Sequence, residues 1–138
     1  GNILRGIDVP VERIASMIDE IPILCVAASF ANGTTRIHNL SELRVKESDR
    51  LLMMAQGLES CGVKVETGDD WIHIHGTGKK PRGGAEIKAS LDHRIAMSFL
   101  VMGSACEHPI TVDDITPIRT SFPNFIPLMN DIGLDIHE

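Results

Sequence analysis

The stretch IPILCVAASFANGTTRI, residues 21–37, decides the fold that we expect for this chain. Its first part is apolar on almost every side, which predicts a helix that is buried all round. Asn32-Gly33 predicts a glycine C-cap at 33, and TTRIHNL (34–40) has the composition of a strand. A helix without a polar face must be covered, so we expect it inside the domain with sheets around it.

A second stretch, HRIAMSFLVMGSACEHPITV (93–112), shows the same order of properties, an apolar helix and then a short strand. Each stretch precedes an amphipathic segment that ends in glycine, Gly62 in the first case and Gly133 in the second. This parallel predicts an internal repeat of roughly 70 residues with approximate bounds 21–85 and 86–138. The alternation of helices and strands predicts an α/β (α+β) fold.

The other elements are assigned from periodicity and from turn residues. Residues 1–19 are expected to be irregular, and Gly68-Asp69-Asp70 predicts the turn of a hairpin. The expected elements are a helix at 46–61, strands at 64–66 and 71–76, a strand at 86–89, a helix at 92–107, a strand at 110–114, a helix at 121–133 and a strand at 134–137.

Composition bounds the partners of the chain. Its net charge is −6, only 4% of its residues are aromatic and tyrosine is absent, which argues against a nucleic-acid surface. The sequence has no apolar run of membrane-spanning length, so we expect no membrane partner. The three widely spaced cysteines, Cys25, Cys61 and Cys106, predict buried thiols in a reducing compartment, the cytoplasm, rather than disulfides.

The octet RVKESDRL (44–51) gathers three cations in an acidic chain. If the helix starts at Lys46, then Lys46 and Arg50 form a like-charge pair at the positive end of the helix dipole. An anionic ligand would relieve both unfavourable features, because it would accept from the free N–H groups and pair with the cations. A solvated helix end in which Glu47 pairs with Arg50 explains the pattern equally well.

The triplet Asp92-His93-Arg94 repeats this theme at the next helix. Asp92 is expected to cap that helix, which leaves Arg94 as a further cation in a first turn. Two basic helix starts in one small domain favour a shared anion pocket. Asp19, just before the buried helix at 21, is either a cap or an acid or base that faces a cleft.

Two weaker signals concern metals and phosphates. His73 and His75 alternate on a strand and share a side, and we expect them to be exposed to solvent. A metal site that adds Cys61 or His93 to them is an alternative, but the spacing links none of these residues, and we expect no metal. The basic loop GTGKKPRGG (76–84) lacks the spacing of a phosphate-binding loop, so a mobile hairpin is expected there.

Four blocks in order resemble the 5-enolpyruvylshikimate-3-phosphate synthase family over nearly the whole chain. They are MIDEIPILCVAASFANGTT (17–35), ELRVKESDRL (42–51), LDHRIAMSF (91–99) and TSFPNF (120–125), and the first and third look most like its glyphosate-tolerant bacterial branch. The resemblance implies transfer of the enolpyruvyl group of phosphoenolpyruvate to the 5-hydroxyl of shikimate 3-phosphate, with release of phosphate and without cofactor or metal. It also implies a cytoplasmic, monomeric enzyme of the shikimate pathway, with two domains of three repeats and the active site between them.

The resemblance also implies roles for single residues. Arg50 and Arg94 match the arginines that hold phosphoenolpyruvate, and Lys46 matches a lysine that contacts shikimate 3-phosphate. Glu47 matches an acid that moves a proton at the phosphoenolpyruvate methylene. Asp19 matches the aspartate that binds the substrate hydroxyls and is the candidate base for the 5-hydroxyl.

His93 is expected to have a minor, orienting role. Thr120 stands where many members of the family carry a lysine that binds phosphoenolpyruvate, so this contact is either absent or shifted to Arg119. The family's N-terminal lysine, its Ser-Ala-Gln loop and the arginines of its other domain are not found. We therefore expect residues 1–138 to be part of the C-terminal-side domain, with about two of its three repeats, inactive without the N-terminal part of the enzyme.

Two other functions fit parts of the pattern. The sibling enolpyruvyl transferase that acts on UDP-N-acetylglucosamine shares the fold, although RVKESDRL and DHRIAM match the shikimate enzyme. A non-catalytic module that binds anions would need the cations but would not need both Asp19 and Glu47.

Overall fold

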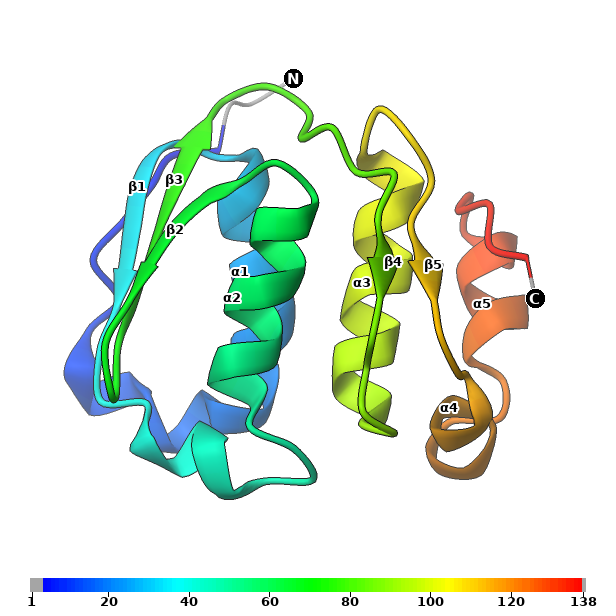
Figure 1. The fold of residues 1–138 in the computed structure, drawn as a ribbon, viewed down its shortest axis with the longest axis horizontal. Coiled ribbons are helices and arrows are strands. Elements are labelled where there is room, and N and C mark those ends of the chain that lie inside the picture. The colour runs from blue at the N-terminus through cyan, green and yellow to red at the C-terminus, as the bar shows by residue number, and fades with distance from the viewer. Residues whose placement is uncertain (1–3, 138) are drawn as a thin grey trace.

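A computed structural model describes residues 4–137, and Figure 1 shows its arrangement. Two sheets flank a group of helices, and short helices cover the C-terminal side. The elements are η1 Val11–Arg13, η2 Ala15–Glu20, α1 Ile21–Phe30, β1 Asn32–Ile37, η3 Ser41–Val45, α2 Arg50–Ser60, β2 Lys64–Thr67, β3 Ile72–Thr77, β4 Glu86–Ile87, α3 His93–Ala105, β5 Thr111–Val112, α4 Thr116–Ser121 and α5 Phe125–Asp131.

The first sheet has the order β1-β3-β2, and both of its strand pairs are antiparallel. The segment 4–9 lies parallel to β1 on its other edge, through bridges from Arg5 to Asn32 and from Asp8 to Arg36. Gly6 allows this close approach, because a Cβ there would lie 2.4 Å from the carbonyl oxygen of Thr34. Strand β1 is therefore flanked on both sides.

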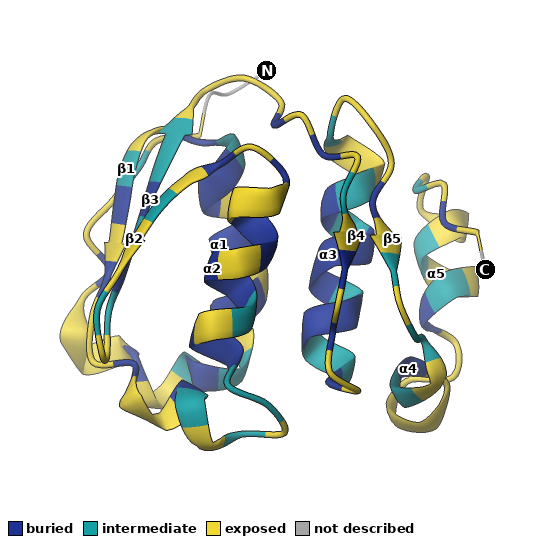
Figure 2. Cartoon of the chain, in the orientation of Figure 1, coloured by how far each residue is buried: buried dark blue, intermediate teal, exposed yellow. Residues whose placement is uncertain are grey.

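The core lies where α1, α2 and α3 contact one another. Helix α1 buries Ile21, Cys25 and Val26, as expected for a helix without a polar face. Helices α2 and α3 meet at Gly57, where an added Cβ would lie 2.2 Å from the ring of Phe99. Figure 2 shows buried residues concentrated on these three helices and exposed residues on the outer surfaces of β2 and α5.

The second sheet is smaller. Strands β4 and β5 pair in parallel, and Gly83 extends the pairing through a bridge to His108. Helix α3 contacts β5 and α4. Among residues 4–137, no strand lies against the other edge of β5. The prediction of a mixed helix and sheet fold with buried helices is confirmed, whereas the repeat bounds 21–85 and 86–138 stay a prediction.

Several expected bounds are wrong for physical reasons. Helix α1 ends at Phe30, and Gly33, with a φ of 108°, belongs to β1 rather than to a C-cap. Helix α2 begins at Arg50 instead of Lys46, because the side chain of Asp49 accepts a hydrogen bond from the N–H of Leu52 and caps the helix there. The like-charge pair expected one helical turn apart is therefore absent.

The C-terminal part also differs from the expectation. The helix expected at 121–133 is the shorter α5, which begins at Phe125, because Phe122 leaves the helical conformation just before Pro123. The separate helix α4, which ends at Ser121, was not expected. Residues 134–137 form no strand. The opening stretch, expected to be irregular, contains a sheet segment and two short helices, although residues 1–3 of it lie outside the described residues. Within the described chain, no helix is long and apolar enough to cross a membrane.

Candidate active site

The five residues singled out by the sequence come together where η2 ends and where α2 and α3 begin. Asp19 lies in η2, Lys46 and Glu47 lie in the link between η3 and α2, Arg50 is the first residue of α2, and Arg94 lies in the first turn of α3. The link is extended at Lys46, so the octet is a loop that leads into a capped helix. In this loop the side chains of Glu47 and Asp49 turn back to the start of α2, where Glu47 accepts from Arg50 and Asp49 accepts from the N–H of Leu52.

Arg50 is the centre of the cluster, and only 1% of its side chain is exposed. Its Nη1 lies 3.3 Å from Oδ1 of Asp19, and its Nη2 lies 2.5 Å from Oε2 of Glu47. Its Nε donates to Oδ2 of Asp92 at 2.8 Å. A buried guanidinium requires such partners, because an unpaired charge in the interior is strongly unfavourable. The expected Glu47–Arg50 pair is present, but the alternative of a solvated helix end is wrong.

Asp92 has a second contact that the sequence did not predict. Its predicted role as the cap of α3 is confirmed, since Oδ1 accepts from the N–H groups of Arg94 and Ile95. The side chain is fully buried, and Oδ2 accepts from Ser48 as well as from Arg50. The signal available in the sequence was a capping aspartate placed directly before a basic residue and an apolar helix.

Electrostatics keeps Asp92 ionised. Burial raises the pKa of this carboxyl group, but the hydrogen bonds from Arg50 and Ser48 and the charge of Arg50 outweigh burial, so its pKa lies below the ordinary value. The pair of Arg50 and Asp92 is thus a charged pair inside the protein. It leaves the terminal nitrogens of Arg50 directed at the more exposed side of the cluster.

The other side of the cluster is accessible to solvent. The side chains of Asp19 and Glu47 are 45% and 54% exposed. Nζ of Lys46 lies 3.9 Å from Oδ1 of Asp19 and 3.5 Å from Oε1 of Glu42. Nη1 of Arg94 donates to the backbone oxygen of Asp19 at 3.2 Å. Lys46 and Arg50 therefore flank the accessible carboxylate of Asp19, and Arg94 contacts the backbone of the same residue, so an incoming anion can compete for these cations.

Two cavities adjoin this cluster. One, of about 390 Å³, is lined by Asp19, His93, Arg94 and several apolar side chains of α3 and α5. The other, of about 430 Å³, is lined by Glu47, His93 and Thr120. Thr120 thus lines the same cavity as Glu47, and His93 lines both.

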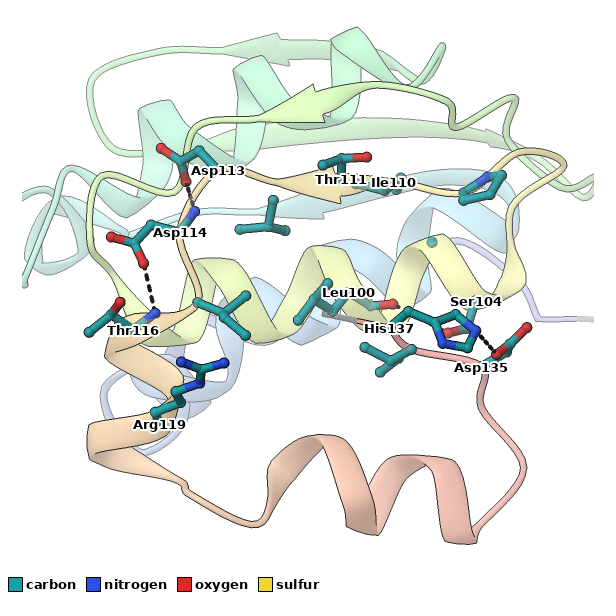
Figure 3. A pocket seen from close by; sticks show the side chains of 15 residues that line it. Leu100, Ser104, Ile110, Thr111, Asp113, Asp114, Thr116, Arg119, Asp135 and His137 are labelled. Atoms are coloured by element: carbon teal, nitrogen blue, oxygen red, sulfur yellow. Dashed lines mark hydrogen bonds and ion pairs between the residues drawn. The ribbon is translucent and has the colours of Figure 1, made fainter.

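A cavity of about 530 Å³ lies elsewhere, between α3, β5 and the C-terminal residues. Figure 3 shows Arg119 on this side, below Thr116. Arg119 lines this cavity and neither of the two cavities that are lined by Asp19 and Arg94 or by Glu47. The arrangement gives no support to the idea that Arg119 takes over the role of the family lysine.

The strand histidines are not as exposed as expected. His73 and His75 are both half-buried on β3. His75 contacts Thr34 and Glu66, while Nε2 of His73 is buried without a hydrogen-bond partner among the described residues. Within residues 4–137, no three histidine, cysteine, aspartate or glutamate side chains are grouped closely enough to hold a metal ion.

The cysteines offer no activated thiol. All three are free, and burial raises the pKa of Cys25 to about 12 and contributes most to raising that of Cys61 to about 11. Such thiols stay protonated at neutral pH and are poor nucleophiles. Neither Cys25 nor Cys61 is therefore suited to act as a nucleophile.

Comparisons with known proteins identify the family of the chain. The family model for EPSP synthase (3-phosphoshikimate 1-carboxyvinyltransferase) matches residues 2–129. The 3-phosphoshikimate 1-carboxyvinyltransferase of Paramagnetospirillum magneticum is 60% identical over 133 residues, which is 96% of this chain and 30% of that protein. The protein of the same name from Cereibacter sphaeroides is 57% identical over the same shares of the two chains.

Solved structures show the same fold. The EPSP synthase of Acinetobacter baumannii superposes with a TM-score of 0.93 at 42% identity, over 98% of this chain and 32% of that one. The enolpyruvyl transferase NikO from Streptomyces tendae shares the fold alone, at 23% identity and a TM-score of 0.67 over 86% of this chain and 26% of its own. This chain spans about 30% of the length of the curated relatives it matches, and it belongs to the EPSP synthase family.

Proposed function

We propose that this chain is part of an enzyme that transfers the enolpyruvyl group of phosphoenolpyruvate to the 5-hydroxyl of shikimate 3-phosphate and releases phosphate. One observation carries the proposal: buried Arg50 pairs with two accessible carboxylates, Asp19 and Glu47, and Arg94 donates to the backbone of Asp19. Both substrates are polyanions, so their site requires cations that are held in place. The chemistry requires an acid and a base at the same location.

In this proposal the arginines hold phosphoenolpyruvate. A guanidinium can pair with a carboxylate or a phosphate through two parallel N–H donors. Arg50 is suited to this because the protein holds its Nε, while its terminal nitrogens face Asp19 and Glu47, which are accessible. Lys46, near Asp19, would contact shikimate 3-phosphate as a more mobile point charge.

The carboxylates would move protons in opposite directions. Asp19 takes the proton of the 5-hydroxyl as that oxygen adds to C2 of phosphoenolpyruvate, and Glu47 delivers a proton to the methylene carbon. The tetrahedral intermediate then loses a proton from the new methyl group and expels phosphate, which restores the enolpyruvyl double bond. Asp19 and Glu47 both contact the terminal nitrogens of Arg50. Phosphoenolpyruvate that replaces them on Arg50 therefore lies next to both carboxylates.

The remainder of the site would come from the rest of the longer enzyme. We infer that this chain alone is inactive and binds shikimate 3-phosphate very weakly, because half of an anion site forfeits positioning and a closed, dry cleft. The parent enzyme would be a cytoplasmic monomer of the glyphosate-tolerant bacterial branch. The blocks MIDEIPIL (17–24) and HRIAMSFLVMG (93–103) support the choice of branch.

A substrate exchange tests the reaction. This chain is mixed with the separately purified remaining portion of the P. magneticum relative, and phosphate release from phosphoenolpyruvate is measured with shikimate 3-phosphate or with UDP-N-acetylglucosamine. Release only with shikimate 3-phosphate supports the proposal, and release with the nucleotide sugar supports the sibling enzyme. Binding of both substrates without any release would support a non-catalytic anion-binding module.

The variants Asp19→Asn and Glu47→Gln refine the result. Each keeps the shape of the side chain and removes its ability to exchange a proton, so each should lower the rate by about 100-fold or more. Retained binding with lost turnover separates the two acids from the binding arginines. An unchanged rate in both variants would exclude the proposed roles.

A further inference from the structure

Asp92 connects the two helix starts that carry the arginines. Its carboxylate is fully buried, and its two oxygens face different elements. Oδ1 accepts from the backbone of α3 at Arg94 and Ile95, at 3.0 and 3.4 Å. Oδ2 accepts from Nε of Arg50 and from Oγ of Ser48, both at 2.8 Å. A single carboxylate thus fixes the start of α3 relative to the side chain of Arg50.

We propose that Asp92 is a positioning residue that sets the spacing and orientation of the two substrate-binding arginines, Arg50 and Arg94. The inference deepens the proposed function and rests on it for the identity of the ligand. It does not make Asp92 a catalytic residue, because the side chain is fully buried and does not face the accessible side of the cluster.

The unequal burial of the three partners of Arg50 supports this role. Asp92 is fully buried, whereas Asp19 and Glu47 are about half exposed. An anionic ligand can displace the exposed carboxylates from the terminal nitrogens, but it cannot reach Nε, which stays on Asp92. Asp92 therefore keeps the guanidinium group of Arg50 oriented through Nε, while Nη1 and Nη2 exchange the carboxylates for the ligand.

A capping role alone does not account for these contacts, and Asp49 provides the comparison. Asp49 caps α2 by accepting from Leu52 and also pairs with an arginine, Arg44, at 2.7 Å. The side chains of that pair are 30% and 34% exposed, and Arg44 is not among the proposed ligand-binding residues. Asp49 and Asp92 thus share capping and arginine pairing, but only Asp92 holds an arginine of the proposed site.

The test uses Asp92→Asn with Asp49→Asn as the matched control. Asparagine caps helices about as well as aspartate, but its NH₂ group cannot accept from Nε of Arg50. The first readout is hydrogen exchange at Nε–H of Arg50 in the 138-residue chain, followed by NMR. Exchange should be faster by at least about tenfold in Asp92→Asn, the effect of losing one hydrogen bond between charged groups, and unchanged in Asp49→Asn.

The second readout is titration with millimolar phosphoenolpyruvate of this chain mixed with the remaining portion of the P. magneticum relative, which should shift the Nε–H signals of both Arg50 and Arg94. In Asp92→Asn the apparent Kd should rise by at least about tenfold. Ser48→Ala keeps the charged pair and removes one partner of Asp92, so it should weaken binding in the same direction by a smaller factor. It also provides the test if Asp92→Asn does not fold.

The outcomes separate the two claims. Protection of Arg50 lost in Asp92→Asn, with no response of either arginine to phosphoenolpyruvate in the mixture that contains the unchanged chain, overturns the proposed function and leaves the geometry of Asp92 intact. A folded Asp92→Asn chain that keeps both the protection and the affinity for phosphoenolpyruvate overturns the positioning role. If that variant does not fold, unchanged protection and affinity in Ser48→Ala overturn it.

Discussion

The two halves of the molecule differ in how completely the edges of their strands are paired. In the first half, β1 lies between the segment 4–9 and β3, so both of its edges are paired. In the second half, β5 pairs with β4 on one edge, and no strand within residues 4–137 covers the other. The cavity of about 530 Å³ lies along β5 (Figure 3), with α3 and the C-terminal residues as its other walls.

The difference in strand pairing indicates which half supports the site. The first half contributes Asp19, Lys46, Glu47 and Arg50, and it places Arg50 at the start of α2, which packs against β2 of the three-stranded sheet. The second half contributes Arg94 and Asp92, and the start of α3 is attached to the first half through the contact between Asp92 and Arg50. The site thus depends on how firmly the second half is held.

The largest expected effect compares core positions in the two sheets. Ile74 in β3 is fully buried, whereas Val112 in β5 is half-buried beside the unpaired edge. Ile74→Ala should lower the free energy of unfolding by about 2–5 kcal/mol, because it leaves a cavity in a packed core. Val112→Ala should cost about 1 kcal/mol or less, because less apolar surface is buried there. Urea unfolding of both variants measures the difference, and equal losses would remove the distinction between the halves.

The contact between the halves can be tested at Gly57. Gly57→Ala adds a Cβ where the ring of Phe99 lies, so α2 and α3 must move apart. Overpacking of this kind costs about 1–3 kcal/mol, which we expect to exceed the helix-propensity gain of about 1 kcal/mol. Gln56→Ala, on the exposed face of the same helix, is the control and should change stability by less than about 0.5 kcal/mol. A Gly57→Ala chain as stable as the control would show that the interface is loosely packed.

Amide hydrogen exchange probes the two edges directly. The N–H groups of Thr111 and Asp113 bond to the segment that contains β4, so the N–H of Val112 points to the unpaired edge. We expect it to exchange at least about 100-fold faster than the N–H of Thr35, a buried residue of β1 that pairs with Ile74 of β3. Protection of Val112 that rises with protein concentration would indicate pairing between two copies. Protection equal to that of Thr35 in dilute solution would contradict the unpaired edge.

The smallest expected effect concerns pH and is confined to the first sheet. Burial lowers the pKa of His73 below 6.5, and the positive charges of His38 and Arg36 lower it further. A folded-state pKa below the unfolded value means that the folded chain binds fewer protons. Stability should therefore be complete above pH 6.5 and decline as pH falls below it. Urea unfolding between pH 8 and 5 should show a smaller decline in His73→Gln, and an identical decline would exclude His73 as the cause.

The sequence allowed good prediction where one strong local signal decides the structure. The apolar runs gave α1 and α3, Asp92 was correctly expected to cap α3, and Gly68-Asp69-Asp70 lies between the paired strands β2 and β3. The start of α2 was wrong because the expected helix was extended through the charged octet to Lys46, whereas the side chain of Asp49 caps the helix at Arg50.

The remaining errors came from contacts that are distant along the chain. The pairing of 4–9 with β1 joins segments without a shared pattern, and the helix expected at 121–133 ignored the break that Pro123 imposes. In the site, charge pattern identified Arg50 and Arg94, but the buried bond from Asp92 to Arg50 joins residues of different helices. Periodicity cannot reveal such a contact, because it depends on how the helices pack.

The most direct test of the account is phosphate release from phosphoenolpyruvate and shikimate 3-phosphate, measured with this chain alone, with the remaining portion of the P. magneticum relative alone, and with both. We predict release only in the mixture and its loss, by about 100-fold or more, when the chain carries Arg50→Lys, since lysine cannot reproduce bidentate pairing. Turnover by the 138-residue chain alone would contradict the account, and so would an inactive mixture of two folded pieces.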